Sequence, residues 1–101
     1  MDSLAALADP TRRRIVERLA EGPLSSGEIA ARFDVTAPAI SQHLKTLREA
    51  RLVRVRAEAQ RRIYELDPAG IDAVADWVAD IRRYWAVRLD ALEAKLKEDE
   101  R

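Results

Sequence analysis

Apolar residues recur every three or four positions through the first half of the chain, which is the spacing of one face of a helix. The pattern predicts four helices: a short one carrying Leu4 and Leu7, one from Pro10 to about Ala20, one opening at Ser25, and one from Thr36 to about Ala50. In the fourth helix, Ile40, Leu44 and Leu47 follow one another at gaps of four and three, so they form its buried edge.

Helix-start signals support these boundaries. Asp9 precedes Pro10, a capping carboxylate followed by the one residue that loses nothing at the first helical position. Ser25 and Glu28 have the spacing of a capping box, and Thr36 supplies a hydroxyl cap. A short helix, the tight turn at Asp34-Val35 and a second helix together predict a helix-turn-helix.

In the next segment, 52–66, apolar residues recur with a different period. Apolar and basic residues alternate from Leu52 to Arg56 and again from Arg62 to Leu66, on either side of a polar stretch at 57–61. A period of two around a polar loop predicts a β-hairpin. The expected fold is therefore mainly α (α+β): a winged helix-turn-helix with a recognition helix at 36–50 and a two-stranded β-hairpin wing at 52–66.

The last third predicts one long helix over 68–97, about 45 Å in length at 1.5 Å per residue. Its apolar positions form a single stripe: Ile71, Val74, Val78, Ile81, Trp85, Leu89, Leu92 and Leu96. The preceding residues are too few to cover such a stripe, and the same helix of a second copy is the simplest partner. The expected homodimer interface comprises Leu4, Leu7, Val78, Ile81, Trp85, Leu89 and Leu92.

Composition fits one small domain spanning 1–101. Of the 101 residues, 48% are hydrophobic and 36% charged, which is typical of a folded protein. The formal net charge is zero, but between Thr36 and Arg62 seven basic residues face only Glu49 and Glu58. A basic segment within a neutral chain directs one surface toward a polyanion.

Several classes are disfavoured. There is no cysteine, which removes disulfides and thiolate metal sites. No apolar run approaches a membrane span and no signal peptide is evident, so we expect a cytoplasmic location without a membrane partner. The chain has no glycine-rich phosphate loop or nucleophile elbow, and Ser41 and His43 point to different helix faces. We therefore expect no enzyme, no catalytic residue and no cofactor.

Three stretches resemble the ArsR-type winged-helix repressors: LADPTRRRIVERL, then LSSGEIAARFDVTAPAISQHLKTLREARLVRVR, then RRIYELDP. The ending RRYWAVRLDALEAKL is similar to the branch that lacks a metal site and often represses its own gene. At the family's thiolate positions this chain has Ser25, Ser26, Glu28 and Ala30, and its terminal helix has Asp72, Asp76 and Asp80 without histidine. The resemblance therefore implies no metal site. The chain lacks the glycine that the family commonly has at the wing tip, which leaves the turn type and the reach of the wing undetermined.

A major groove of DNA accepts an α-helix, so the exposed side of the 36–50 helix is the expected reading surface. Gln42 can pair with adenine and Ser41 with a base or a phosphate, while Ala37 and Pro38 offer apolar contact to thymine methyls. The expected DNA-binding set is Thr36, Ala37, Pro38, Ser41, Gln42, His43, Lys45, Thr46, Arg54, Arg56, Arg61 and Arg62.

Three alternatives remain open on the sequence. His43, the only histidine, fits either a packing or capping role or a phosphate contact. Trp77, Tyr84 and Trp85 fit either interface anchors or the lining of a small apolar ligand site, and no inducer is indicated. The whole domain fits either a repressor that binds an inverted repeat as a homodimer or a winged-helix module that binds protein. The DNA-binding hypothesis fails if the wing arginines are sequestered by the chain's own carboxylates.

Overall fold

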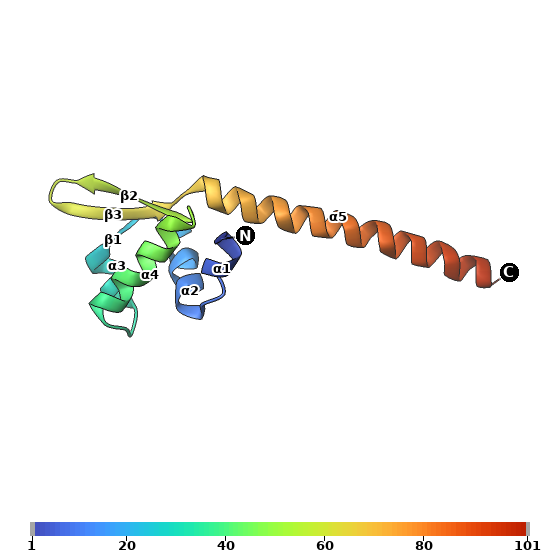
Figure 1. Ribbon diagram of the computed structural model, residues 1–101, viewed down its shortest axis with the longest axis horizontal. Helices are drawn as coiled ribbons and strands as arrows, with labels where there is room; N and C mark the ends of the chain where they lie inside the picture. The colour runs from blue at the N-terminus through green and yellow to red at the C-terminus, as the bar shows by residue number, and fades with distance from the viewer. Residues whose placement is uncertain (1, 101) are drawn as a thin grey trace.

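The computed structural model describes residues 2–100, which form a small helical body with a hairpin on one side and one long projecting helix (Figure 1). The elements in chain order are α1 (Asp2–Ala6), α2 (Pro10–Leu19), β1 (Leu24–Ser25), α3 (Ser26–Arg32), α4 (Ala37–Glu49), β2 (Val53–Glu58), β3 (Arg61–Leu66) and α5 (Pro68–Asp99). The principal extents are 72 × 24 × 22 Å, and α5 accounts for the long dimension.

The helix starts lie at the residues that the capping signals predict. The Asp9 carboxylate accepts the N–H of Arg12 at 2.9 Å. Both halves of the capping box form, since Glu28 N–H donates to Ser25 Oγ and Ser25 N–H donates to the Glu28 carboxylate. Thr36 Oγ1 accepts the N–H of Ala39 at 3.2 Å, which opens the predicted recognition helix.

The core lies where the helices meet the hairpin. The inward edge of α4, made of Ile40, Leu44 and Leu47, is at most 2% exposed. Around it pack side chains from the other elements, including Ile15, Leu19, Leu24, Ile29, Leu52, Val53 and Tyr64. Burial of this edge fixes the rotation of α4 about its axis, so its opposite side must face outward.

The hairpin differs from the sequence prediction in two respects. It belongs to a three-stranded antiparallel sheet of order β1-β3-β2, because the short β1 pairs Leu24 with Tyr64. The loop is also shorter than the predicted polar stretch at 57–61. Glu58 pairs with Arg61, so only Ala59 and Gln60 form the turn. A two-residue loop makes a tight wing whose strands hold their register to the tip.

The long helix α5 is only partly covered by the body. Ile71 and Val74 pack against the core, and α1 lies against α5. Beyond them the predicted stripe is uncovered: Val78 is 41%, Ile81 37%, Trp85 58% and Leu89 56% exposed. Within residues 2–100, no helix is long and apolar enough to cross a membrane.

The wing turn carries backbone strain that can be tested. Ala59 has a φ of +56°, a left-handed conformation that glycine adopts without steric cost. We expect Ala59→Gly to stabilise the protein by up to about 1 kcal/mol, as measured by denaturant unfolding. Ala57→Gly, inside β2, is the matched control and should destabilise by roughly 0.5–1 kcal/mol. Equal destabilisation by both variants would contradict this account.

Candidate nucleic-acid interface

The outer side of α4 presents four exposed side chains next to one another. Pro38, Ser41, Gln42 and Lys45 are all exposed and lie opposite the buried edge of the helix. Positions 38, 41, 42 and 45 are three or four residues apart, so they form one surface. Thr36 and Ala37 are also exposed, at the helix start.

His43 and Thr46 lie on a different flank of α4, facing α2 and α1. Both are only partly exposed, and the Thr46 hydroxyl donates back to the carbonyl oxygen of Gln42 at 3.1 Å. The Nδ1 of His43 is buried, 3.9 Å from the Asp9 carboxylate, and has no hydrogen-bond partner within residues 2–100. His43 is therefore set apart from the outer surface of α4, whereas Thr46, four residues after Gln42, lies at the edge of that surface.

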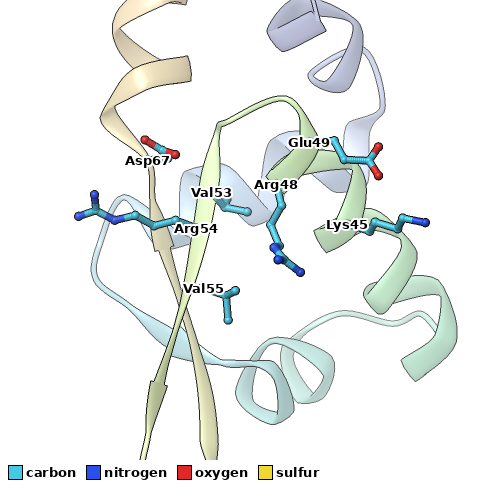
Figure 2. Close-up of a pocket in the computed structure, with 7 residues that line it drawn as sticks. All are labelled: Lys45, Arg48, Glu49, Val53, Arg54, Val55 and Asp67. Carbon is cyan, nitrogen blue, oxygen red and sulfur yellow. The ribbon is translucent and has the colours of Figure 1, made fainter.

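The four wing arginines divide between two faces of the hairpin. Arg62 shares its face with the buried Tyr64, so it projects from the wing on the side of the helical body. The other three lie on the opposite face, because Arg54 and Arg56 alternate with Val53 and Val55, and Arg61 alternates with Arg62. Figure 2 shows this directly: Val53 and Val55 point toward α4, while Arg54 points away from it.

Three of the wing arginines form ion pairs with glutamates. Arg54 contacts Glu65 at 3.1 Å, Arg56 contacts Glu58 at 3.1 Å, and Arg61 contacts Glu28 of α3 at 2.6 Å. The arginine side chains nevertheless stay 56%, 47% and 60% exposed, respectively. Pairs this exposed are held weakly, so they can be exchanged for a phosphate, and the arginines are not sequestered.

Arg62 differs from the other three wing arginines. It is exposed and has no carboxylate within salt-bridge distance in the described part of the chain. Since it also projects on the side of the body, it is the wing cation best placed to meet a ligand lying along α4.

A groove of about 470 Å³ separates α4 from the free edge of β2 (Figure 2). Its basic lining comprises Lys45, Arg48 and Arg54, with Glu49 and Asp67 at its margin. Sequence reasoning counted Arg48 toward the basic charge but did not include it among the site residues. The available signal was its spacing, because Arg48 follows Ser41 and Lys45 by seven and three positions and so shares their flank.

Two carboxylates beside this surface are held in their charged form. The backbone N–H of Arg12 donates to Asp9 and lowers the pKa of that carboxyl, with a smaller contribution from nearby His43. The backbone N–H and the hydroxyl of Ser25 lower the pKa of Glu28, with a smaller contribution from Arg61. Glu28 is thus a permanent anion at neutral pH, placed where it competes with any phosphate for Arg61.

Comparison with known proteins agrees with this geometry. Residues 7–56 match the model of a family described as a helix-turn-helix domain. The chain is 55% identical over 80 residues to the HTH-type transcriptional regulator Rv2034 of Mycobacterium tuberculosis, covering 79% of this chain and 72% of that protein. It is 33% identical over 73 residues to the transcriptional repressor SdpR of Bacillus subtilis, covering 72% of this chain and 81% of that protein.

Solved structures give the same result. An ArsR-like transcriptional regulator from a Rhodococcus species superposes with a TM-score of 0.77 at 30% identity, covering 90% of this chain and 86% of that one. The chain belongs to the ArsR family of transcriptional regulators. As a member of the ArsR family it is a winged helix-turn-helix regulator that binds DNA, and it is not an enzyme. A winged helix that binds only protein is not favoured.

The pair between Arg61 and Glu28 generates a prediction about DNA affinity. Glu28→Gln keeps the capping acceptor but removes the anion that competes for Arg61, so duplex affinity should rise several-fold irrespective of sequence. The log–log salt slope should steepen by up to about 0.9, the value of one further phosphate contact. Glu21→Gln, which removes the same charge from the pair with Arg18 on α2, is the control. If the two variants gain equally in duplex titrations, Arg61 plays no special part.

Proposed function

We propose that this ArsR family member binds an inverted-repeat operator as a homodimer and represses transcription by occupying it. The observation that carries the proposal is the exposed surface of Pro38, Ser41, Gln42 and Lys45, flanked by a basic wing, on a chain whose dimerisation stripe is uncovered. α4 then enters the major groove with this surface against the base edges.

Base reading falls to the middle of that surface. Gln42 is the candidate for a two-pronged pair with adenine, and Ser41 is a candidate for a base or a phosphate. Ala37 and Pro38 offer apolar contact to a thymine methyl. Gln42 is exposed, and its side chain forms no hydrogen bond with another residue in the described part of the chain. It is therefore free to engage a base.

Phosphate contacts fall to the residues around it. Thr36 and Lys45 flank the reading surface, and Arg62 and Arg48 extend it toward the wing and the adjoining groove. Arg54, Arg56 and Arg61 join only by releasing glutamates. His43 acts in this scheme as a support between α4 and the cap of α2, and a direct phosphate contact by it is the weaker of its two roles.

The second copy is needed to cover α5. Val78, Ile81, Trp85, Leu89 and Leu92 are between 37% and 58% exposed, an apolar strip that a lone protomer would present to water. Two such strips facing each other across a two-fold axis bury one another, with Leu4 of α1 and Leu7, just after α1, beside them. Trp85 then serves as an interface anchor, a role for which tryptophan is enriched.

A two-fold dimer presents two α4 helices on one side of the assembly. Successive major-groove faces of B-DNA are about 34 Å apart, so an operator made of two inverted half-sites fits this arrangement. Bound near a promoter in the cytoplasm, the dimer excludes RNA polymerase by competition. The relative named a transcriptional repressor supports this direction of control.

The DNA-binding proposal is tested in two steps: selection of the sequences bound from a random duplex pool, and titration of duplex binding at several salt concentrations. We expect an inverted repeat to be enriched. Gln42→Ala should weaken the selected operator and relax preference at one position, a loss on the order of 1–3 kcal/mol. Arg62→Ala should weaken every sequence alike and reduce the salt slope by about 0.9. Uniform loss with Gln42→Ala would exclude the base contact.

Pairing through α5 is tested separately. Ile81→Asp places a charge in the apolar stripe, so the protein should sediment as a monomer and lose most of its affinity for a two-half-site operator. Val87→Asp is the matched control, because Val87 is 68% exposed and lies on the side of α5 away from the stripe. An Ile81→Asp variant that remains fully dimeric would contradict the proposed interface.

A further inference from the structure

The end of α4 lies directly on the first turn of α5. α4 ends at Glu49 with Ala50 as its cap, and Arg51 follows in a left-handed conformation at φ +59°. The N–H of Gly70 donates to the carbonyl of Arg51 at 2.8 Å, and the N–H of Asp67 donates to the carbonyl of Leu52 at 2.9 Å. Two backbone hydrogen bonds thus join the segment that directly follows α4 to the start of α5.

Gly70 has no room for a side chain at this contact. A Cβ built there would lie 2.3 Å from the Arg51 carbonyl oxygen, 2.6 Å from its carbon and 2.9 Å from the Ala50 carbonyl oxygen. All three atoms belong to the backbone, so they cannot turn aside as a side chain would. Ordinary contact begins at 3.4 Å, so a methyl group at residue 70 requires the start of α5 and the backbone that follows α4 to shift relative to each other by about 1 Å.

Few large side chains lie directly beside this contact, although Ile71 and Val74 pack against the core on the neighbouring face of α5. A hollow of about 230 Å³ lies alongside, lined largely by small or short residues that include Ser3, Ala50, Ala69 and Ala73. The Ser3 hydroxyl approaches the Ala50 carbonyl only at 3.5 Å. At this point the separation of the helices is set by the close approach of two backbones, which the absence of a Cβ at Gly70 permits.

We propose that Gly70 is a positioning residue for operator recognition: it fixes the angle between α4 and α5 and thereby the half-site spacing that the dimer accepts. The inference rests on the proposed function. In a dimer held through α5, α4 is oriented relative to the two-fold axis by this joint. The reading end of α4 lies about 18 Å from it, at 1.5 Å per residue, so a small tilt moves the base-contacting side chains appreciably.

Gly70→Ala tests this with operators whose half-sites are moved apart or together in single base-pair steps. We expect the variant to stay dimeric in sedimentation and to keep its affinity for random duplex. It should lose roughly tenfold or more on the wild-type spacing, about the effect of one mismatched base pair, and should prefer a different spacing. Gly27→Ala is the matched control, since a Cβ at this helical glycine meets nothing within 4 Å.

A folded, dimeric Gly70→Ala protein with the wild-type affinity and spacing preference would overturn the proposal. A wild-type protein that selects no paired half-sites would instead overturn the proposed function, so the two failures are distinguishable. If Gly70→Ala does not fold, amide hydrogen exchange in the wild-type protein decides. The Gly70 and Asp67 amides should be protected as strongly as Leu44 in the core, and exchange as fast as at Gln60 in the wing turn would refute a rigid joint.

Discussion

Burial of one edge of α4 is the constraint on which the site depends. Ile40, Leu44 and Leu47 are nearly inaccessible, and they lock the helix against α2, α3 and the hairpin. A rotation by one residue would expose these side chains and turn Ser41 and Lys45 toward the core, so the core and the exposed surface are two consequences of one pattern. The DNA-facing residues need no packing of their own, which leaves them free to vary with the operator while the fold stays the same.

Because the net charge is zero, the electrostatics of the site depends on where individual charged residues lie rather than on their sum. Glutamates sit within reach of three wing arginines, and Glu28 is held charged by the cap of α3. Each such ion pair must break before its arginine can bind a phosphate, and this requirement lowers the expected nonspecific affinity for DNA. Arg62, which has no ion pair within residues 2–100, and the outer surface of α4 carry no such cost. In the proposed DNA complex, this arrangement favours contacts from α4, the candidate for reading bases, over contacts from the wing, the candidate for phosphates.

Local signals were enough to predict much of this. Caps at Asp9, Ser25 and Thr36 and the periodicity of α4 and α5 are properties of neighbouring residues, and the structure agrees with each. What sequence reasoning missed depends on contacts between distant segments. The pairing of Leu24 with Tyr64 adds a strand, and the register of β2 with β3 places Arg62 apart from Arg54. The importance of Gly70 likewise cannot be seen in the sequence, because it follows from the close contact with the carbonyl of Arg51.

Operator recognition on this chain divides into two separable problems. In the proposed dimer, the outer surface of α4 determines which base is read, and the position of α4 relative to α5 determines how far apart the half-sites lie. The first is held by side-chain burial and tolerates exchange of exposed residues. The second, as proposed, depends on the backbone contact at Gly70, where there is no room for a Cβ. A regulator must also release its operator. In the proposed dimer, the contact between the end of α4 and the start of α5 is made of two backbone hydrogen bonds beside a cavity, so a modest change in its geometry would change the orientation of both α4 helices.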